Sequence, residues 1–163
     1  TNSKVILGFK DRIWRTSNSS VGSVITNNLQ SGWDSSMLQN GDEGLGTYTF
    51  FMGGIEGQSV SKNSNHVQRC LNRIDEIYPG TSKVYTGASQ IYNWTENPFA
   101  KGSYLCLKPG EWNTYDYDEW QKPESGLYFV GEHCSKKYQG FMNGAAESAR
   151  LTIEKLLKDI DSQ

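Results

Sequence analysis

Short runs of apolar and β-branched residues, separated by Gly, Pro and polar turns, recur along the chain as far as residue 107. Runs of about four to eight such residues are typical of strands. The run Gly-Thr-Tyr-Thr-Phe-Phe-Met, closed by Gly53-Gly54, is strongly β-prone. We therefore predict strands at residues 4–9, 21–26, 33–38, 46–52 and 102–107, and extended segments between residues 84 and 94.

One segment between these strands has helical periodicity instead. Asn65 is a suitable N-cap, and Pro79-Gly80 is a typical stop signal. Between them the apolar positions fall on one face of a helix. These positions are Val67, Cys70, Leu71, Ile74 and Ile77.

The C-terminal stretch combines a predicted strand, a loop and a predicted helix. Residues 127–130 are apolar without alternation, which is typical of a short buried strand. A polar loop follows Gly131-Glu132, and a helical pattern begins at Phe141. Charged residues occupy one helix face, and the other, apolar face is formed by Met142, Ala145, Ala149, Ile153, Leu156 and Ile160. If part of the protein is missing, this helix is expected to expose apolar surface to it.

The start of this last helix carries almost no side chains, because Gly140, Gly144, Ala145 and Ala146 lie there. Small residues allow another group to approach the backbone closely. A helix N-terminus also presents free N–H groups and a positive dipole end to anionic or electron-rich ligands. From the spacing alone, a ligand site and tight packing on a sheet are equally good interpretations.

Composition limits the classes of partner. The chain has 163 residues, enough for one domain with a sizeable core, and its net charge is −2. The scattered Lys and Arg residues make nucleic acid and anionic membranes poor partners. No apolar run is long enough to span a membrane and no signal peptide is visible, so the compartment stays open with the cytoplasm favoured. The three cysteines have no metal-site spacing and are expected to be buried or loop thiols.

Two linked segments resemble the C-terminal flavin-binding signature of the flavin-containing amine oxidase family, which includes monoamine, polyamine and L-amino acid oxidases. They are Tyr128-Phe129-Val130-Gly131-Glu132 and Gly140-Phe141-Met142-Asn143-Gly144-Ala145. The resemblance continues upstream in family order. It includes the strand and turn from Lys4 to Trp14, the segment from Trp94 to Tyr104, and Pro109-Gly110.

The resemblance implies an α/β, or mixed α+β, fold that corresponds to the last third of a family member. Residues 1–125 would form part of a substrate-domain sheet, and residues 126–163 would be the last strand and helix of the FAD-binding domain. No Gly-x-Gly-x-x-Gly follows a predicted strand. We therefore expect a C-terminal portion, either a split subunit, a processed chain or a truncated product, which is inactive alone and needs an N-terminal half, a partner chain or self-association.

The family pattern also implies roles for single residues. Lys4 matches a lysine that holds a water beside the reactive flavin nitrogen, whereas a solvated strand-end lysine is the simpler interpretation. Tyr104 and Phe141 match the two aromatic residues that flank the substrate amine, although family members often have tyrosine at both places. Ser103 stands where monoamine oxidases have a cysteine bonded to the flavin, so FAD binding is expected to be non-covalent.

Other matched positions are expected to contact FAD. Glu132 would lie near the ribityl and phosphate region, accepting a hydroxyl or holding loop amides. The amides of residues 140–142 would face the flavin pyrimidine edge, where the helix dipole would stabilise negative charge. No metal site is expected. The full implied cofactor-binding set is Trp94, Gly131, Glu132, Gly140, Phe141, Met142 and Ala145.

The implied function is part of an FAD-dependent amine or L-amino acid oxidase, which oxidises a carbon–amine bond to an imine and reduces dioxygen to hydrogen peroxide. One alternative is a non-catalytic interaction module, which the missing Gly-rich unit favours and the retained Lys4, Trp94, Tyr104 and Glu132 disfavour. Another is a flavin desaturase or protoporphyrinogen-type oxidase, which the segment from Trp94 to Tyr104 disfavours.

Overall fold

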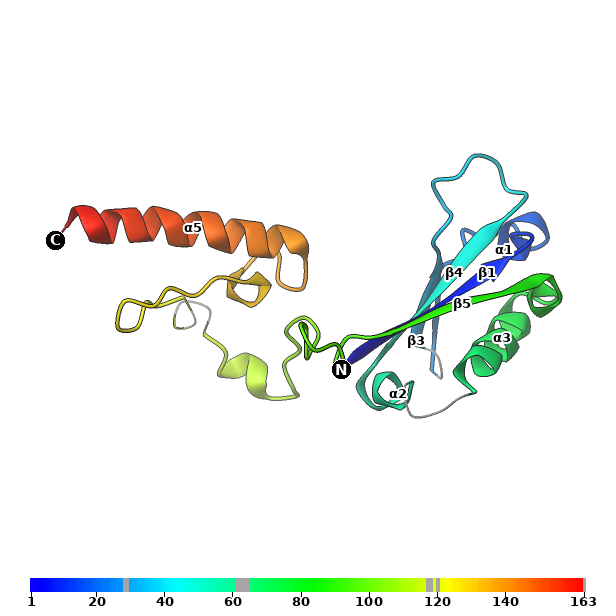
Figure 1. Ribbon diagram of the computed structural model, residues 1–163, viewed down its shortest axis with the longest axis horizontal. Coiled ribbons are helices and arrows are strands. Elements are labelled where there is room, and N and C mark those ends of the chain that lie inside the picture. The colour runs from blue at the N-terminus through cyan, green and yellow to red at the C-terminus, as the bar shows by residue number, and fades with distance from the viewer. Residues whose placement is uncertain (28–29, 61–64, 117–118, 120, 163) are drawn as a thin grey trace. The chain divides into compact units, whose positions relative to one another are not determined.

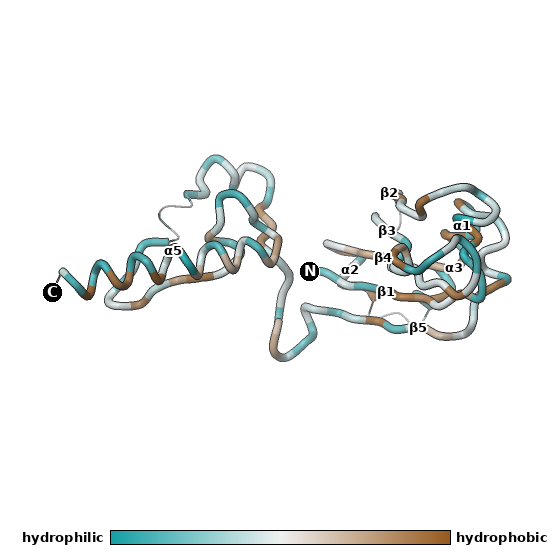
Figure 2. Tube along the Cα trace, turned by 90° about the horizontal axis from the view of Figure 1, so that it is seen from above, coloured by the Kyte–Doolittle hydropathy of each residue, from teal (hydrophilic) through white to brown (hydrophobic). Residues whose placement is uncertain are grey.

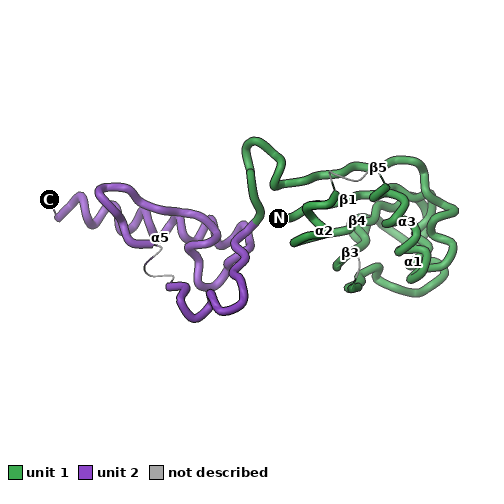
Figure 3. The backbone as a smooth tube through the Cα atoms, turned by 90° about the horizontal axis from the view of Figure 1, so that it is seen from below, with its two compact units in different colours: residues 1–103 green, residues 104–163 purple. Residues whose placement is uncertain are grey.

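The computed structural model describes residues 1–27, 30–60, 65–116, 119 and 121–162. The chain forms two compact units, Thr1–Ser103 and Tyr104–Gln163 (Figure 3). Each unit has its own internal hydrogen bonds and is described by itself below.

The first unit is built on a five-stranded antiparallel sheet, with the order β2-β3-β4-β1-β5 among the described residues (Figure 1). The long strands β1 and β4 lie side by side near its centre, and β5 forms one edge. This arrangement confirms a mixed α and β fold. The strands are β1 (Asn2–Phe9), β2 (Val24–Thr26), β3 (Gln30–Asp34), β4 (Gly46–Gly53) and β5 (Tyr85–Asn93).

Helices cover one face of this sheet. Alternate β1 residues Val5, Leu7 and Phe9 are buried, as the pleat of a half-covered strand requires. They belong to one hydrophobic core with Cys70 and Ile74 of the covering helix α3. Burial of each large apolar side chain contributes roughly 1.5–3 kcal/mol. The helical elements of this unit are α1 (Ile13–Thr16), α2 (Gly54–Ser59), α3 (His66–Ile77) and the 3-10 turn η1 (Thr81–Val84).

The helix that we predicted from Asn65 is confirmed, and its predicted apolar face packs on the core. The predicted strand at residues 33–38 has different bounds, because β3 ends at Asp34. The buried Asp34 carboxylate accepts hydrogen bonds from the Ser36 backbone N–H at 2.7 Å and from the Ser36 hydroxyl at 2.5 Å. These local bonds turn the chain away from the sheet.

The second unit has little regular structure before its last helix. Its elements are η2 (Glu111–Asn113), η3 (Glu132–Cys134) and α5 (Met142–Asp161). The predicted strand at residues 102–107 does not form, and the predicted buried strand at residues 127–130 is reduced to a single bridge between Leu127 and Glu124. An apolar segment becomes a strand only where a neighbouring strand pairs with it, and none is present beside either segment in the described chain.

The helix α5 forms where we predicted it, and within this unit it packs through small and polar residues. Its buried positions are Gly144, Ser148 and Thr152, spaced four residues apart. Gly144 is required there, because a Cβ atom would collide with the Tyr138 carbonyl oxygen. Hydrophobic residues recur along the rest of the helix and stay exposed (Figure 2). The apolar face of α5 is thus exposed within this unit, and the helix contacts the loops that cover it through small and polar residues.

Candidate functional site

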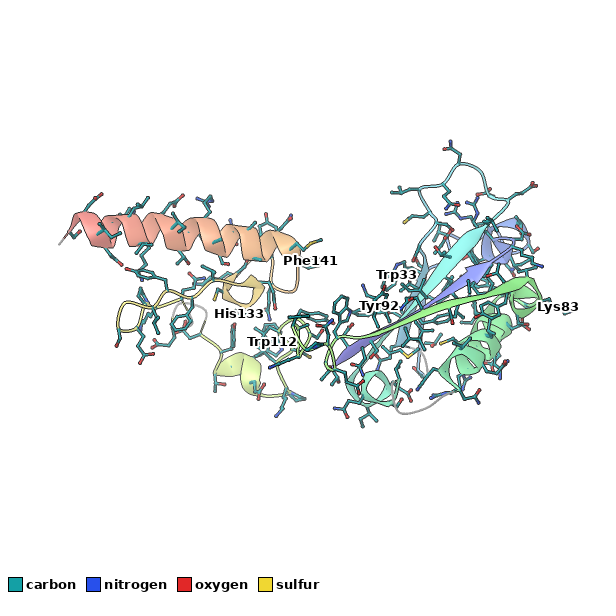
Figure 4. The ribbon with its side chains drawn as sticks, viewed as in Figure 1. Trp33, Lys83, Tyr92, Trp112, His133 and Phe141 are labelled. Atoms are coloured by element: carbon teal, nitrogen blue, oxygen red, sulfur yellow. The ribbon has the colours of Figure 1, made fainter. Side chains whose placement is uncertain are left out.

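In the first unit the open face of the sheet carries a lysine among aromatic rings. Lys4 of β1 lies directly opposite Phe51 of β4 and Tyr92 of β5, and directly opposite residues of an antiparallel pair point to the same face. Trp33 follows Ser31, the β3 partner of Phe51, by two residues and shares this face. Figure 4 labels Trp33 and Tyr92 on the sheet. We call Lys4, Trp33, Phe51 and Tyr92 the lysine face.

The rings of the lysine face hold the ammonium group in place. Lys4 Nζ lies 5.5 Å from the centroid of the Phe51 ring and 5.9 Å from that of the Trp33 ring. The two rings contact each other with centroids 5.7 Å apart. A cation near aromatic faces is stabilised by about 0.5–2 kcal/mol, depending on its desolvation. The Lys4 side chain thus keeps a charged N–H donor group at a half-buried, largely apolar position.

Trp94 continues the same row of aromatic residues. Its backbone N–H donates to the Asn2 carbonyl oxygen at 3.1 Å, just beyond the end of β5. Its indole stacks on the Tyr92 ring, with centroids 5.9 Å apart and planes 14° apart. The structure therefore connects the two predicted residues Lys4 and Trp94 through Tyr92.

In the second unit Glu132 of η3 holds two separate backbone segments. Its carboxylate accepts the Leu105 N–H at 2.7 Å through Oε1 and the Gly140 N–H at 2.5 Å through Oε2. We call this arrangement the Glu132 clamp. We expected Glu132 either to accept a hydroxyl or to hold loop amides, and within the chain its carboxylate holds loop amides.

The clamp joins the segments that carry Tyr104 and Phe141. A Cβ atom on Gly140 would lie 3.7 Å from Tyr104 Cδ2, so the tyrosine ring lies against the Gly140 backbone. Gly140 has a φ of +82°, a conformation that L side chains rarely adopt. Phe141 follows as the N-cap residue of α5 and is exposed, as Figure 4 shows at the start of that helix. The structure thus brings two of the predicted site segments together.

Gly131 is fixed to α5 by Ser148, a residue that our sequence analysis did not select. The Gly131 N–H donates to Ser148 Oγ at 3.0 Å, and Ser148 Oγ lies 2.8 Å from the Gly131 carbonyl oxygen. The same hydroxyl lies 3.0 Å from the carbonyl oxygen of Ala145. Ser148 is buried. The sequence signal that could have identified Ser148 was a serine in an otherwise apolar helix pattern, because a buried hydroxyl needs a hydrogen-bond partner.

The thiol next to the clamp is buried and lies near a negative charge. Burial, and to a lesser extent the negative charge of Glu132, raises the pKa of the Cys134 thiol. Cys134 is therefore a neutral, inert thiol rather than a nucleophile. Cys70 in the first unit is likewise buried, and desolvation raises its pKa to about 12.

The N-terminus of α5 is suited to an electron-rich group. It has no side-chain cap and no acidic residue in its first turn, and Met142 is 91% exposed. The first amides of a helix have no intrahelical acceptor and lie at the positive dipole end. Of the three amides that we expected to face a ligand, the Gly140 N–H donates to Glu132 Oε2 and the Phe141 N–H to the Tyr138 carbonyl oxygen at 3.1 Å, which leaves the Met142 amide of this set.

The described residues contain no cluster of metal-ligating side chains, and no described helix could cross a membrane.

Comparisons with known proteins give a consistent picture. The family model described as flavin containing amine oxidoreductase matches residues 1–156. Polyamine oxidase 6 of Oryza sativa subsp. japonica is 36% identical over 106 residues, which are 61% of this chain and 20% of that protein. Pseudooxynicotine dehydrogenase of a Pseudomonas species is 35% identical over 74 residues, which are 45% of this chain and 15% of that protein.

Solved structures share the fold. Cyclohexylamine oxidase from Brevibacterium oxydans IH-35A superposes with a TM-score of 0.78 at 16% identity, covering 98% of this chain and 35% of that one. Putrescine oxidase bound to putrescine gives a TM-score of 0.76 at 14% identity, with 96% and 35% covered. The chain thus spans about a third of these structures. Because the family model covers residues 1–156, the chain belongs to the flavin-containing amine oxidoreductase family.

Proposed function

We propose that this chain is the C-terminal portion of an FAD-dependent amine or L-amino acid oxidase. In the overall reaction an amine and dioxygen give an imine and hydrogen peroxide, and bound FAD supplies the redox chemistry. The observation that carries the proposal is the lysine face, which holds the Lys4 ammonium against Phe51 and Trp33 in a chain of this family.

Lys4 positions a water molecule that takes part in the reduction of dioxygen. The surrounding rings restrict the ammonium group, and its N–H groups can donate to a water that is sheltered from bulk solvent. A positive charge at this place also favours the negative charge that develops as dioxygen is reduced.

Tyr104 and Phe141 orient the substrate amine. Both are substantially exposed within their own unit, at 49% and 70%, so their rings are available to a ligand. Two aromatic rings can direct an amine towards an acceptor and exclude water around it. Because Phe141 has no hydroxyl group, the Tyr104 hydroxyl is the one polar group of this pair of rings.

FAD binds non-covalently, since Ser103 cannot form a thioether. Of the amides of residues 140–142, that of Gly140 donates to Glu132 and that of Phe141 donates to the Tyr138 carbonyl oxygen at 3.1 Å, so the uncapped start of α5 offers the Met142 amide to the flavin pyrimidine edge. Trp94 lies near the ring. Residues 1–125 belong to the substrate domain and residues 126–163 to the FAD domain. The Gly-rich dinucleotide-binding part comes from the family's N-terminal half, as a partner chain or a preceding segment.

A product assay tests this proposal. The flavin-loaded protein that contains this chain should consume dioxygen and release hydrogen peroxide in equal amounts when putrescine, spermidine, cyclohexylamine or an L-amino acid is supplied. The imine should appear as its hydrolysed carbonyl product in the same amount. If none of these substrates supplies the electrons for oxygen consumption, the proposal is contradicted.

A further inference from the structure

We propose that the first unit carries a second binding site, which takes a free α-amino acid with a large apolar side chain. The site is a pocket of about 460 Å³ beside α1, at the end of β1 opposite to Asn2 (Figure 1). This volume is typical of small-molecule sites. None of its lining residues is among those assigned above to the flavin or the amine, and the site does not depend on the proposed function. The lining residues are Arg15, Ser19, Ser20, Val21, Met37 and Asp42.

Two opposite charges lie side by side in this pocket without a hydrogen bond between them. Arg15 Nη1 lies 3.8 Å from Asp42 Oδ1, whereas Arg15 Nη2 lies 2.6 Å from the buried Asp34 carboxylate. Hydrogen bonds between a guanidinium and a carboxylate measure about 2.7–2.9 Å, so the pair with Asp42 is open. The Nη1 bond to the Gly41 carbonyl oxygen is also long, at 3.4 Å. Arg15 Nη1 and Asp42 can therefore each take a stronger partner.

The arginine side of the pocket is held firmly. The Asp34 carboxylate fixes the guanidinium of Arg15, whose side chain is 12% exposed. The Ser19 N–H donates to the Arg15 carbonyl oxygen at 3.1 Å, and Ser20 Oγ lies 2.8 Å from the Tyr78 hydroxyl oxygen. These contacts fix the backbone that presents two serines to the same pocket as the guanidinium. Hydroxyl donors beside a guanidinium are suited to a carboxylate.

The acidic side of the pocket is carried by a loop that Arg12 fixes. The Arg12 guanidinium is buried, and it donates to the carbonyl oxygens of Gly41, at 2.8 Å, and of Glu43. Asp42 lies between these two residues, and its side chain is 75% exposed. Its carboxylate is thus accessible to an ammonium group while its backbone stays in place.

The open charge pair and the apolar wall define the ligand. An α-amino acid carries its carboxylate and ammonium groups on one carbon atom, so it can bridge Arg15 Nη1 and Asp42 Oδ1. Val21 and Met37, which are 72% and 61% exposed, offer apolar surface to its side chain. A residue inside a peptide has no such pair of charges. The geometry therefore selects a free amino acid, and the volume favours a large side chain such as that of phenylalanine.

Methyl NMR of the full chain titrated with L-phenylalanine tests the site without any oxidase activity. The ligand ring should shift the methyl signals of Val21 and Met37 in a saturable way, with a Kd of about 1 mM for so small a ligand. The analogue 3-phenylpropanoate lacks the ammonium group and 2-phenylethylamine lacks the carboxylate, so each should bind about tenfold more weakly. If neither methyl signal shows a saturable shift with phenylalanine, the proposal is overturned, whatever the protein oxidises.

Asp42→Asn distinguishes charge pairing from general apolar binding. It removes the charge of an exposed side chain, and it should raise the Kd for phenylalanine about tenfold without weakening 3-phenylpropanoate, which has no ammonium group. Glu43→Gln is the matched control, because it removes the neighbouring charge, which does not line the pocket, and it should change this Kd by less than about twofold. Equal affinity of Asp42→Asn and the unmodified chain for phenylalanine would also overturn the proposal.

Discussion

Lys4 and Phe51 lie directly opposite each other on β1 and β4, and the lysine Nζ lies 5.5 Å from the centroid of the phenylalanine ring. This pairing places a charged side chain on the aromatic, open face of a sheet whose other face is the hydrophobic core. A lysine at the end of a strand usually extends into solvent. Here two rings hold it, which supports a role beyond solubility.

Replacement of Lys4 by methionine should slow the reoxidation of reduced flavin by dioxygen while FAD stays bound. The change keeps the length of the side chain and removes its charge and hydrogen-bond donors. Rapid mixing of the reduced protein with dioxygen measures this step. Lys83→Met is the control, because Lys83 is an exposed lysine of η1 at the far end of the unit (Figure 4). Equal reoxidation rates for Lys4→Met and the unmodified protein would return Lys4 to a structural role.

Replacement of Tyr104 by phenylalanine should affect the other half-reaction. The ring remains and the hydroxyl is lost, so amine oxidation should slow by about 1 kcal/mol of activation free energy. Anaerobic mixing with amine measures this rate without dioxygen. Tyr78→Phe is the control. It removes a hydroxyl that lies 2.8 Å from Ser20 Oγ and should leave the rate of amine oxidation unchanged. If Tyr104→Phe instead slowed the reaction of reduced flavin with dioxygen, the assignment of Tyr104 to amine oxidation would be contradicted.

Asp34 should be a main source of stability in the first unit. Its carboxylate is buried and lies 2.6 Å from the Arg15 guanidinium. Asp34→Asn should lower the free energy of unfolding by about 3 kcal/mol, because it leaves the Arg15 guanidinium without its carboxylate partner. Glu76→Gln breaks the exposed pair with Arg73 and should cost less than about 1 kcal/mol. Chemical denaturation measures both, and equal effects of the two variants would contradict this account.

The same residue sets a pH dependence. Burial alone would raise the pKa of Asp34, but the hydrogen bonds from Ser36 and the adjacent Arg15 guanidinium help to lower it below its usual value. A carboxyl group whose pKa is lowered by folding stabilises the native state above its unfolded pKa, about 3.9. This contribution is lost as the pH falls through the lower, folded value. Stability of the unmodified chain should therefore fall more steeply below pH about 4 than that of Asp34→Asn.

The exposed apolar residues of α5 should cause association. Ile153, Leu157 and Ile160 are each more than half exposed, a pattern that marks an interaction face. Without a partner chain we expect concentration-dependent self-association in sedimentation velocity. Leu157→Glu should weaken it, whereas Ala146→Glu, at another exposed position of the helix, should not. A dilute monomer that stays monomeric at high concentration would contradict this expectation.

The sequence predicted those elements whose stabilising contacts are local or strongly periodic. The apolar spacing from Val67 to Ile77 specified α3, and the pattern after Phe141 located α5 correctly. The strand predicted at residues 127–130 is absent because strand formation depends on a neighbour, which residue propensity does not reveal. The contacts of α5 could not be predicted from its apolar spacing, because Gly144 and Ser148 pack on backbone groups rather than on apolar side chains.

The same limit applied to the candidate site. Lys4 and Trp94 could be selected because they match a family pattern, whereas Trp33 and Phe51 could not. Their position beside Lys4 follows from the register of β1, β3 and β4, which joins residues far apart in sequence. The two amides held by Glu132 are also distant in sequence, so only the folded chain shows which of its predicted roles is formed.

Anaerobic reduction of the bound flavin tests the central claim most directly. The flavin-loaded protein that contains this chain should lose its yellow absorbance when mixed with an amine or L-amino acid substrate, and recover it with release of hydrogen peroxide when dioxygen is admitted. If putrescine, spermidine, cyclohexylamine and the L-amino acids all leave the flavin oxidised, while a chemical reductant bleaches it normally, the protein is not an amine or amino acid oxidase.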